Sequence, residues 1–108
     1  MDASVDIYGV TKGFPKSETY GLTSQMRRAA ISIAANIAEG HGRENTGAFV
    51  QFLRIAQGSL KELETHLILA QRLGYLDDET ASGLLARTDE IGRMIRSMIR
   101  RLQEKLAE

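Results

Sequence analysis

The 108-residue sequence predicts an all-α fold: a single domain, residues 1–108, built as an antiparallel up-down four-helix bundle with a short first helix. Apolar residues recur at alternating spacings of three and four over two long segments, which is the heptad pattern of helices in a left-handed bundle. The chain has a single Pro and few β-branched runs, so it offers little material for a sheet. We expect helices over residues 3–12, 18–40, 45–73 and 77–105.

Three breaks separate these segments. Residues 12–15 (KGFP) end the opening helix, because Gly and Pro disfavour its continuation. Residues 40–42 (GHG) predict a left-handed glycine cap for the second helix, and Gly74 predicts a Schellman-type end for the third. Asn45 and Asp77 are expected to cap the N-termini of the third and fourth helices.

Each of the three longer segments carries an apolar stripe that we expect to face a shared core. In the second segment the stripe is Leu22, Met26, Ala29, Ala30, Ile33 and Ile37. In the third it is Phe49, Leu53, Ala56, Leu60, Leu63, Leu67 and Ala70. In the fourth it is Ala81, Leu84, Thr88, Ile91, Ile95, Met98 and Leu102.

The second helix carries further apolar residues outside its core stripe, which are Ile31, Ala34, Ala35 and Ala38. A helix that is apolar on more than one side is buried on more than one side. A chain of this length has little core to spare for a second buried face. The sequence therefore predicts an oligomer interface at these residues.

Polar side chains form a stripe along facing flanks of the second and third helices. They are Gln25, Arg28, Ser32, Asn36, Glu39, Ser59 and Glu62. We interpret them as a structural hydrogen-bond network that fixes the helix register, since buried polar groups satisfy one another. A hairpin that turns near residue 44 pairs Ala29 with Ser59 and brings Arg28 within one turn of Glu62. We therefore expect Arg28 and Glu62 to be coupled.

Catalytic and metal-binding interpretations of this stripe are weaker. Di-iron bundles use Glu-x-x-His pairs on two helices, whereas this chain has two His residues, one of them in a loop. Ser32, His66 and Glu62 can be drawn as a triad, but no strained nucleophile turn surrounds the serine. We expect no enzymatic activity, no metal and no cofactor.

Positive charge is local rather than global, because Lys plus Arg and Asp plus Glu number 14 each. The candidate nucleic-acid-binding residues are Arg27, Arg43, Arg54, Lys61, Arg93, Arg96, Arg100 and Arg101. Arg93, Arg96 and Arg100 share one face of the fourth helix, an arrangement suited to phosphates. Cations near a helix C-terminus also complement its dipole, which is the simpler interpretation. Aromatic residues are too few to predict base stacking, so binding of RNA or DNA would follow charge and shape.

The remaining composition bears on location. The chain has no Cys, and its first residues, MDASVDIYGV, lack the basic and apolar regions of a signal peptide. No apolar run approaches the roughly 18 residues of a membrane span. We expect a soluble cytoplasmic protein that does not engage membranes.

Two long segments, YGLTSQMRRAAISIAANIAEGHGR (20–43) and FVQFLRIAQGSLKELETHLILAQRLGYL (49–76), carry a family resemblance, as does IYGVTKGFP (7–15). They resemble the four-helix-bundle family first noticed in intervening sequences of bacterial large-subunit ribosomal RNA genes. A divergent branch is the accessory protein of diversity-generating retroelements. The resemblance implies a homopentameric ring and, for the accessory branch, binding to nucleic acid and to a reverse transcriptase. The family's first helix is usually longer and contains a Trp that this chain lacks.

Two functions are compatible with these features. The first is a non-enzymatic, oligomeric accessory protein that binds nucleic acid through basic patches with little sequence specificity. The alternative is a homo-oligomeric scaffold for a protein partner such as a reverse transcriptase, with nucleic acid being incidental. Steep salt dependence of RNA or DNA binding would favour the first.

Overall fold

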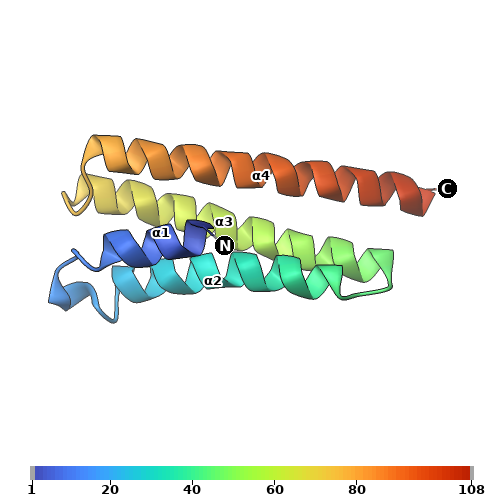
Figure 1. The fold of residues 1–108 in the computed structure, drawn as a ribbon, viewed down its shortest axis with the longest axis horizontal. Helices are drawn as coiled ribbons and strands as arrows, with labels where there is room; N and C mark the ends of the chain where they lie inside the picture. The colour runs from blue at the N-terminus through green and yellow to red at the C-terminus, as the bar shows by residue number, and fades with distance from the viewer. Residues whose placement is uncertain (1, 108) are drawn as a thin grey trace.

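The computed structural model describes residues 2–107 and shows a four-helix bundle, with no β-strand among those residues (Figure 1). Its elements are α1 (Asp2–Thr11), the short 3-10 helix η1 (Lys16–Glu18), α2 (Leu22–His41), α3 (Thr46–Arg72) and α4 (Asp78–Ala107). Successive α-helices run back and forth along the 51 Å long axis (Figure 1). The predicted all-α class is confirmed.

The core is the shared apolar face of α2, α3 and α4, closed along part of its length by α1. The predicted stripe of α2 is buried from Leu22 to Ile33, and that of α3 from Leu53 to Ala70. Ile7 of α1 is also fully buried, so the short first helix contributes to the same core. Burial of these side chains is the main favourable term that holds the helices together.

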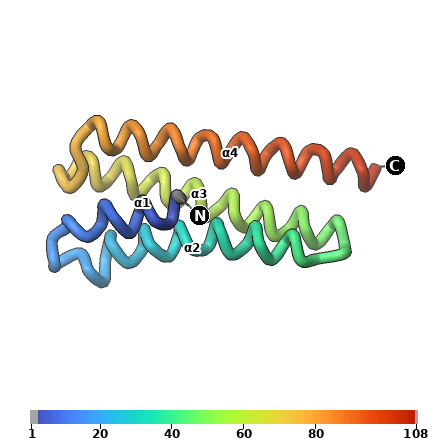
Figure 2. Tube along the Cα trace, viewed as in Figure 1, coloured from blue at the N-terminus to red at the C-terminus, as the bar shows by residue number. Residues whose placement is uncertain are grey.

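One half of the bundle is not covered by α1. This helix has ten residues, and Figure 2 shows it beside the half of the molecule that lies away from the α2–α3 connection. Some predicted core positions toward this half are only partly buried, and they are Ile37, Phe49, Ile91, Met98 and Leu102. Their neighbours Leu53 and Ile95 are fully buried, so the core continues past the end of α1.

The predicted N-caps of α3 and α4 are confirmed. The Asn45 Oδ1 atom accepts a hydrogen bond of 2.9 Å from the backbone N–H of Ala48. The Asp77 Oδ1 atom accepts one of 2.7 Å from the backbone N–H of Thr80, and this bond holds the pKa of Asp77 below its ordinary value. Each cap satisfies a backbone donor that the helix itself leaves without a partner.

The predicted Schellman-type end of α3 is also confirmed. Gly74 has a φ of 80°, the left-handed conformation that favours glycine. Its N–H donates to the carbonyl of Gln71 at 3.0 Å, and the N–H of Tyr75 donates to the carbonyl of Ala70 at 2.9 Å. These are the two hydrogen bonds of the motif.

Gly42 is the C-cap residue of α2, but the left-handed conformation predicted for this glycine cap is wrong, since Gly42 has a φ of −78°. Among residues 2–107 only Gly74 has a positive φ, and α2 continues through Gly40 to His41. Gly40 is required for packing instead. A Cβ atom at this position would lie 2.7 Å from Phe49 Cδ1 and 3.2 Å from Phe52 Cβ, so the absent side chain lets α2 approach α3 closely.

The second helix begins four residues later than the expected start at residue 18. Residues 16–18 form η1, a turn follows, and Gly21 occupies the N-cap position of α2 without a side-chain cap of its own. Glu18 acts on the helix from outside: its Oε1 atom accepts from the Leu22 N–H at 3.1 Å, and its Oε2 atom accepts from the Tyr75 hydroxyl at 2.9 Å. The latter bond raises the pKa of Tyr75.

The register of α2 against α3 differs from the expected one by about one helical turn. Ser59 lies against Ser32, with 2.8 Å between the two Oγ atoms, and not against Ala29 as symmetric folding about residue 44 predicts. The close contact of Gly40 with Phe49 fixes this register at the connected end of the two helices.

Candidate nucleic-acid interface

The second half of α4 presents exposed cations from several turns of one helix. They are Arg93, Arg96, Arg100, Arg101 and Lys105, with Glu104 as the one acid in residues 91–107. The helix begins with Asp78 and Glu79, so its charges follow the direction of the helix dipole. The effect of the helix dipole on side-chain charges is confined to the last turn, so it does not explain the cations several turns earlier.

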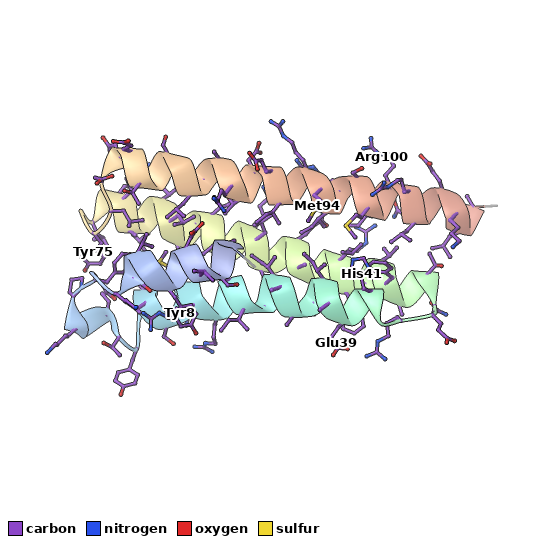
Figure 3. The ribbon with its side chains drawn as sticks, in the orientation of Figure 1. Tyr8, Glu39, His41, Tyr75, Met94 and Arg100 are labelled. Atoms are coloured by element: carbon purple, nitrogen blue, oxygen red, sulfur yellow. The ribbon has the colours of Figure 1, made fainter. Side chains whose placement is uncertain are left out.

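Ion pairing divides these cations into two groups. Arg93 is engaged by Asp89 of the preceding turn, with 2.9 Å between Nη2 and Oδ2. The others have no acidic partner within residues 2–107, and they are Arg96, Arg100, Arg101 and Lys105. Figure 3 shows the Arg100 side chain on the side of α4 that faces away from α2. Arg96, Arg100, Arg101 and Lys105 extend around about half of the helix circumference, and we refer to these four residues as the α4 basic face.

Two predicted nucleic-acid-binding residues outside α4 are committed to neighbouring acids. Arg43 pairs with Glu39 at 3.1 Å, and Lys61 pairs with Glu64 at 3.3 Å. Arg54 is exposed and forms no ion pair among the described residues. The predicted set is therefore not one continuous surface of unneutralised charge.

Arg27 is held against α1. Its Nε atom donates a 2.9 Å hydrogen bond to the Thr11 hydroxyl, and its guanidinium carbon lies 4.5 Å from the centre of the Tyr8 ring. Stacking on an aromatic face stabilises a guanidinium without neutralising it. Arg27 therefore links α2 to α1 and keeps its positive charge.

The predicted polar network forms only in part. The Asn36 Nδ2 atom donates to the carbonyl and hydroxyl oxygens of Ser32 at 2.8 and 3.1 Å, and Ser32 in turn contacts Ser59. Glu39 belongs to the surface pair with Arg43. The side chains of the remaining members make no hydrogen bond within residues 2–107, and they are Gln25, Arg28 and Glu62.

The expected coupling of Arg28 with Glu62 is wrong as an ion pair, since none joins them among the described residues. Both side chains are exposed, so neither needs a partner to be accommodated. The changed register at Ser59 also removes the pairing from which this coupling was expected.

Thr88 and Glu64 form a polar contact that was not predicted from the sequence. Thr88 occupies a core position of α4 at 3% exposure, and its single hydroxyl proton is shared between Glu64 Oε2 at 3.1 Å and the Leu85 carbonyl at 2.9 Å. The signal was the single polar residue in an apolar heptad stripe, because a buried hydroxyl requires a partner. On α3, His66 Nδ1 is buried without a hydrogen-bond partner in the part of the chain that the structure describes.

The predicted oligomer-interface residues lie on the outside of the chain. Ile31 is 47% exposed, Ala35 and Ala38 are exposed, and Ala34 is half-buried. No helix of residues 2–107 covers this side of α2, so its apolar surface faces outward in the isolated protomer.

An apolar concavity lies in the half of the bundle that α1 does not cover. It has a volume of about 200 Å³ and is lined by Phe49 of α3 and by Met98, Arg101 and Leu102 of α4. At the edge of the concavity, the centre of the His41 ring lies 4.8 Å from the centre of the Phe49 ring. The concavity therefore combines an apolar lining with an unpaired cation of the α4 basic face.

The described residues hold neither a metal-ligand cluster nor a membrane-spanning helix. Within residues 2–107, His, Asp and Glu side chains form no group of three placed to hold a metal ion. None of the described helices has the length and apolar character needed to cross a membrane.

Comparison with known proteins identifies the family of this four-helix bundle. The 23S rRNA-intervening sequence protein family matches residues 1–97. The chain belongs to this family. The match confirms the resemblance found in the sequence and covers α1, α2, α3 and most of α4. Of the α4 basic face, Arg96 lies inside the matched region, whereas Arg100 and Arg101 follow it.

A solved structure supports the assignment to the 23S rRNA-intervening sequence protein family. The chain is similar to a protein of unknown function from the S23 ribosomal protein family of Bacteroides thetaiotaomicron VPI-5482, with 26% sequence identity and a TM-score of 0.78. The alignment covers 89% of this chain and 87% of that protein. No curated protein matches the chain.

Proposed function

We propose that this member of the 23S rRNA-intervening sequence protein family is a non-enzymatic, oligomeric protein that binds RNA or DNA through the α4 basic face. The observation that carries the proposal is the absence of ion pairs at Arg96, Arg100, Arg101 and Lys105 within the described residues, beside the paired Arg93. Cations that are not engaged in an ion pair remain available to phosphates, and binding releases counterions. Because no groove-reading element accompanies them, sequence specificity is low.

The proposed assembly is a homopentameric ring of antiparallel up-down protomers in the cytoplasm. The outward apolar side of α2 supports self-association, since Ile31 and its small neighbours leave room for close helix contact. The pentamer itself comes from the family resemblance. A ring repeats the α4 basic face, and several weak contacts to one polyanion then act together.

A second candidate function is a scaffold for a protein partner such as a reverse transcriptase. The apolar concavity at Phe49, Met98 and Leu102 favours it, because a cavity of about 200 Å³ fits apolar side chains of a partner. In that case nucleic acid would contact the protein only incidentally.

Binding measured against salt separates the two functions. We compare the wild type with a triple variant, Arg96→Gln, Arg100→Gln and Arg101→Gln, on RNA and DNA duplexes of unrelated sequence. The expected result is weaker binding to all duplexes and a shallower slope of log affinity against log salt, by about 0.9 for each phosphate that the variant no longer neutralises. Arg93→Gln is the matched control, since its charge is already offset by Asp89. Unchanged affinity and slope in a correctly assembled triple variant would favour the scaffold.

A further inference from the structure

A second concavity lies where α1, the segment before α2 and the first turns of α2 meet. It has a volume of about 270 Å³, and its lining includes Tyr8, Tyr20, Arg27, Arg28 and Ile31, the last of which borders the proposed oligomer interface. No acidic residue lines it. Figure 3 shows Tyr8 on α1 next to the beginning of α2. Two of the three tyrosines of the chain thus line the same concavity as two adjacent arginines, although the tyrosines are not adjacent in the sequence.

Tyr20 has no packing role that explains it. Its side chain is 94% exposed, in the turn between η1 and α2. An aromatic ring normally contributes to stability by burying its large apolar surface. This ring leaves both faces accessible to a planar ligand.

The two arginines at this place keep their charge. Arg27 is oriented by the Thr11 hydroxyl and the Tyr8 ring, and neither group is an anion. Arg28 is exposed and has no ion pair within residues 2–107. The orientation of Arg27 is therefore fixed before any ligand arrives, and the charge of Arg28 is available beside it.

The acids in neighbouring elements are occupied elsewhere. Glu18 uses one carboxylate oxygen for the Leu22 N–H and the other for the Tyr75 hydroxyl. Asp6 of α1 pairs with Arg87 of α4 at 3.2 Å. Neither acid therefore pairs with Arg27 or Arg28, although the Glu18 carboxylate remains an anion two residues from Tyr20.

We infer that this concavity binds an unpaired nucleotide of a single-stranded nucleic acid, with a phosphate at Arg27 and Arg28 and a base stacked on Tyr20. The inference rests on the proposed function and adds a preference for single strands, which the α4 basic face does not provide. Phosphate groups attract arginines in any nucleic acid, but only an unpaired base offers its face to an aromatic ring. The hydroxyls of Thr23 and Ser24, which also line the concavity, are additional donors for phosphate oxygens.

The test compares Tyr20→Ala with Tyr20→Phe on three fluorescein-labelled probes of equal length: a deoxythymidine strand, an abasic strand and a duplex. Tyr20→Ala should weaken binding of the thymidine strand about tenfold, the usual effect of removing a stacking ring. It should not change binding of the abasic strand or the duplex, nor the salt slope, because no charge is removed. Tyr20→Phe keeps the ring and should bind like the wild type. Arg28→Gln should weaken both single strands and flatten their slope by about 0.7.

A second readout is the tyrosine fluorescence of the bound protein, which reports on stacking instead of affinity. The chain has no Trp, so its intrinsic emission comes from three tyrosines. The thymidine strand should quench this emission in the wild type, and the abasic strand should not. In Tyr20→Phe, whose ring still stacks, the quenching should fall to the contribution of Tyr8, which lines the same concavity.

The remaining outcomes separate this inference from the proposed function. If Tyr20→Ala binds all probes like the wild type while the α4 triple variant binds them weakly, the inference is overturned and the proposed function stands. If the wild type binds none of the probes, both fail. If Tyr20→Ala weakens binding of a polyglutamate peptide, relative to the wild type, as much as it weakens binding of the thymidine strand, the site serves an acidic protein segment. The inference is then again overturned.

Discussion

Replacing Gly40 by Ala tests the close approach of α2 to α3. In most helical positions this change stabilises a protein by about 1 kcal/mol, because Ala is the better helix former. At Gly40 the new Cβ atom would lie 2.7 Å from Phe49 Cδ1, 3.0 Å from Phe49 Cε1 and 3.2 Å from Phe52 Cβ. Phe49 can turn toward the neighbouring concavity, but Phe52 Cβ is fixed to its backbone.

The magnitude follows from two opposing contributions. Overpacking of this severity costs about 3 kcal/mol, and the gain in helix propensity returns about 1 kcal/mol. We expect Gly40→Ala to lower the free energy of unfolding by about 2 kcal/mol. Gly58→Ala is the matched control, because Gly58 lies inside α3 and a Cβ atom there would meet nothing within 4 Å. That variant should gain about 1 kcal/mol.

Urea unfolding followed by circular dichroism measures both variants, at one protein concentration because oligomers are stabilised by mass action. The two changes should move the midpoint in opposite directions. Equal stabilisation by both would refute the reasoning, since it would mean that α2 and α3 are not in close contact at Gly40.

Two further predictions concern the outer side of α2 and the cap of α4. Ala35→Glu places a charge in the proposed interface and should reduce the native mass seen by light scattering to that of a protomer, whereas Ala86→Glu on α4 should not; an intact oligomer in Ala35→Glu would contradict the interface. Asp77→Ala should lower the free energy of unfolding at neutral pH. Because its hydrogen bond to Thr80 lowers the pKa of Asp77 in the folded state, this contribution is present above the ordinary carboxyl pKa and is lost as pH falls through the lowered value. Unfolding curves of the wild type and Asp77→Ala should therefore converge in acid, and a constant difference would reject the cap.

Features governed by nearest neighbours along the chain could be predicted from the sequence. The caps at Asn45 and Asp77 and the glycine end of α3 depend on residues within five positions of one another. The apolar stripes depend only on helical periodicity. These rules hold before any tertiary contact forms.

Features that depend on contacts between residues far apart in the chain could not be predicted from the sequence. Glu18 looks like the first residue of a helix, yet its carboxylate is fixed by Tyr75, 57 positions later. Gly40 looks like a terminator, yet the aromatic rings of α3 determine its role. The gathering of Tyr20 with Arg27 and Arg28 likewise requires the turn that η1 makes before α2. Such placements follow from tertiary packing, for which the sequence alone gives no distance.

The limited reach of α1 has a consequence for how the molecule opens. Amide hydrogens in the part of the bundle that includes α1 are held by four packed helices and by the link from Glu18 to Tyr75, so they should exchange with solvent only through near-complete unfolding. The last turns of α4 have fewer packed neighbours, and their amides should exchange by local fraying. Arg101 and Lys105 of the α4 basic face lie on these turns. A polyanion that binds these turns only when they are helical would therefore slow the exchange of their amides. Occupancy of the site could then be followed residue by residue without any label on the nucleic acid.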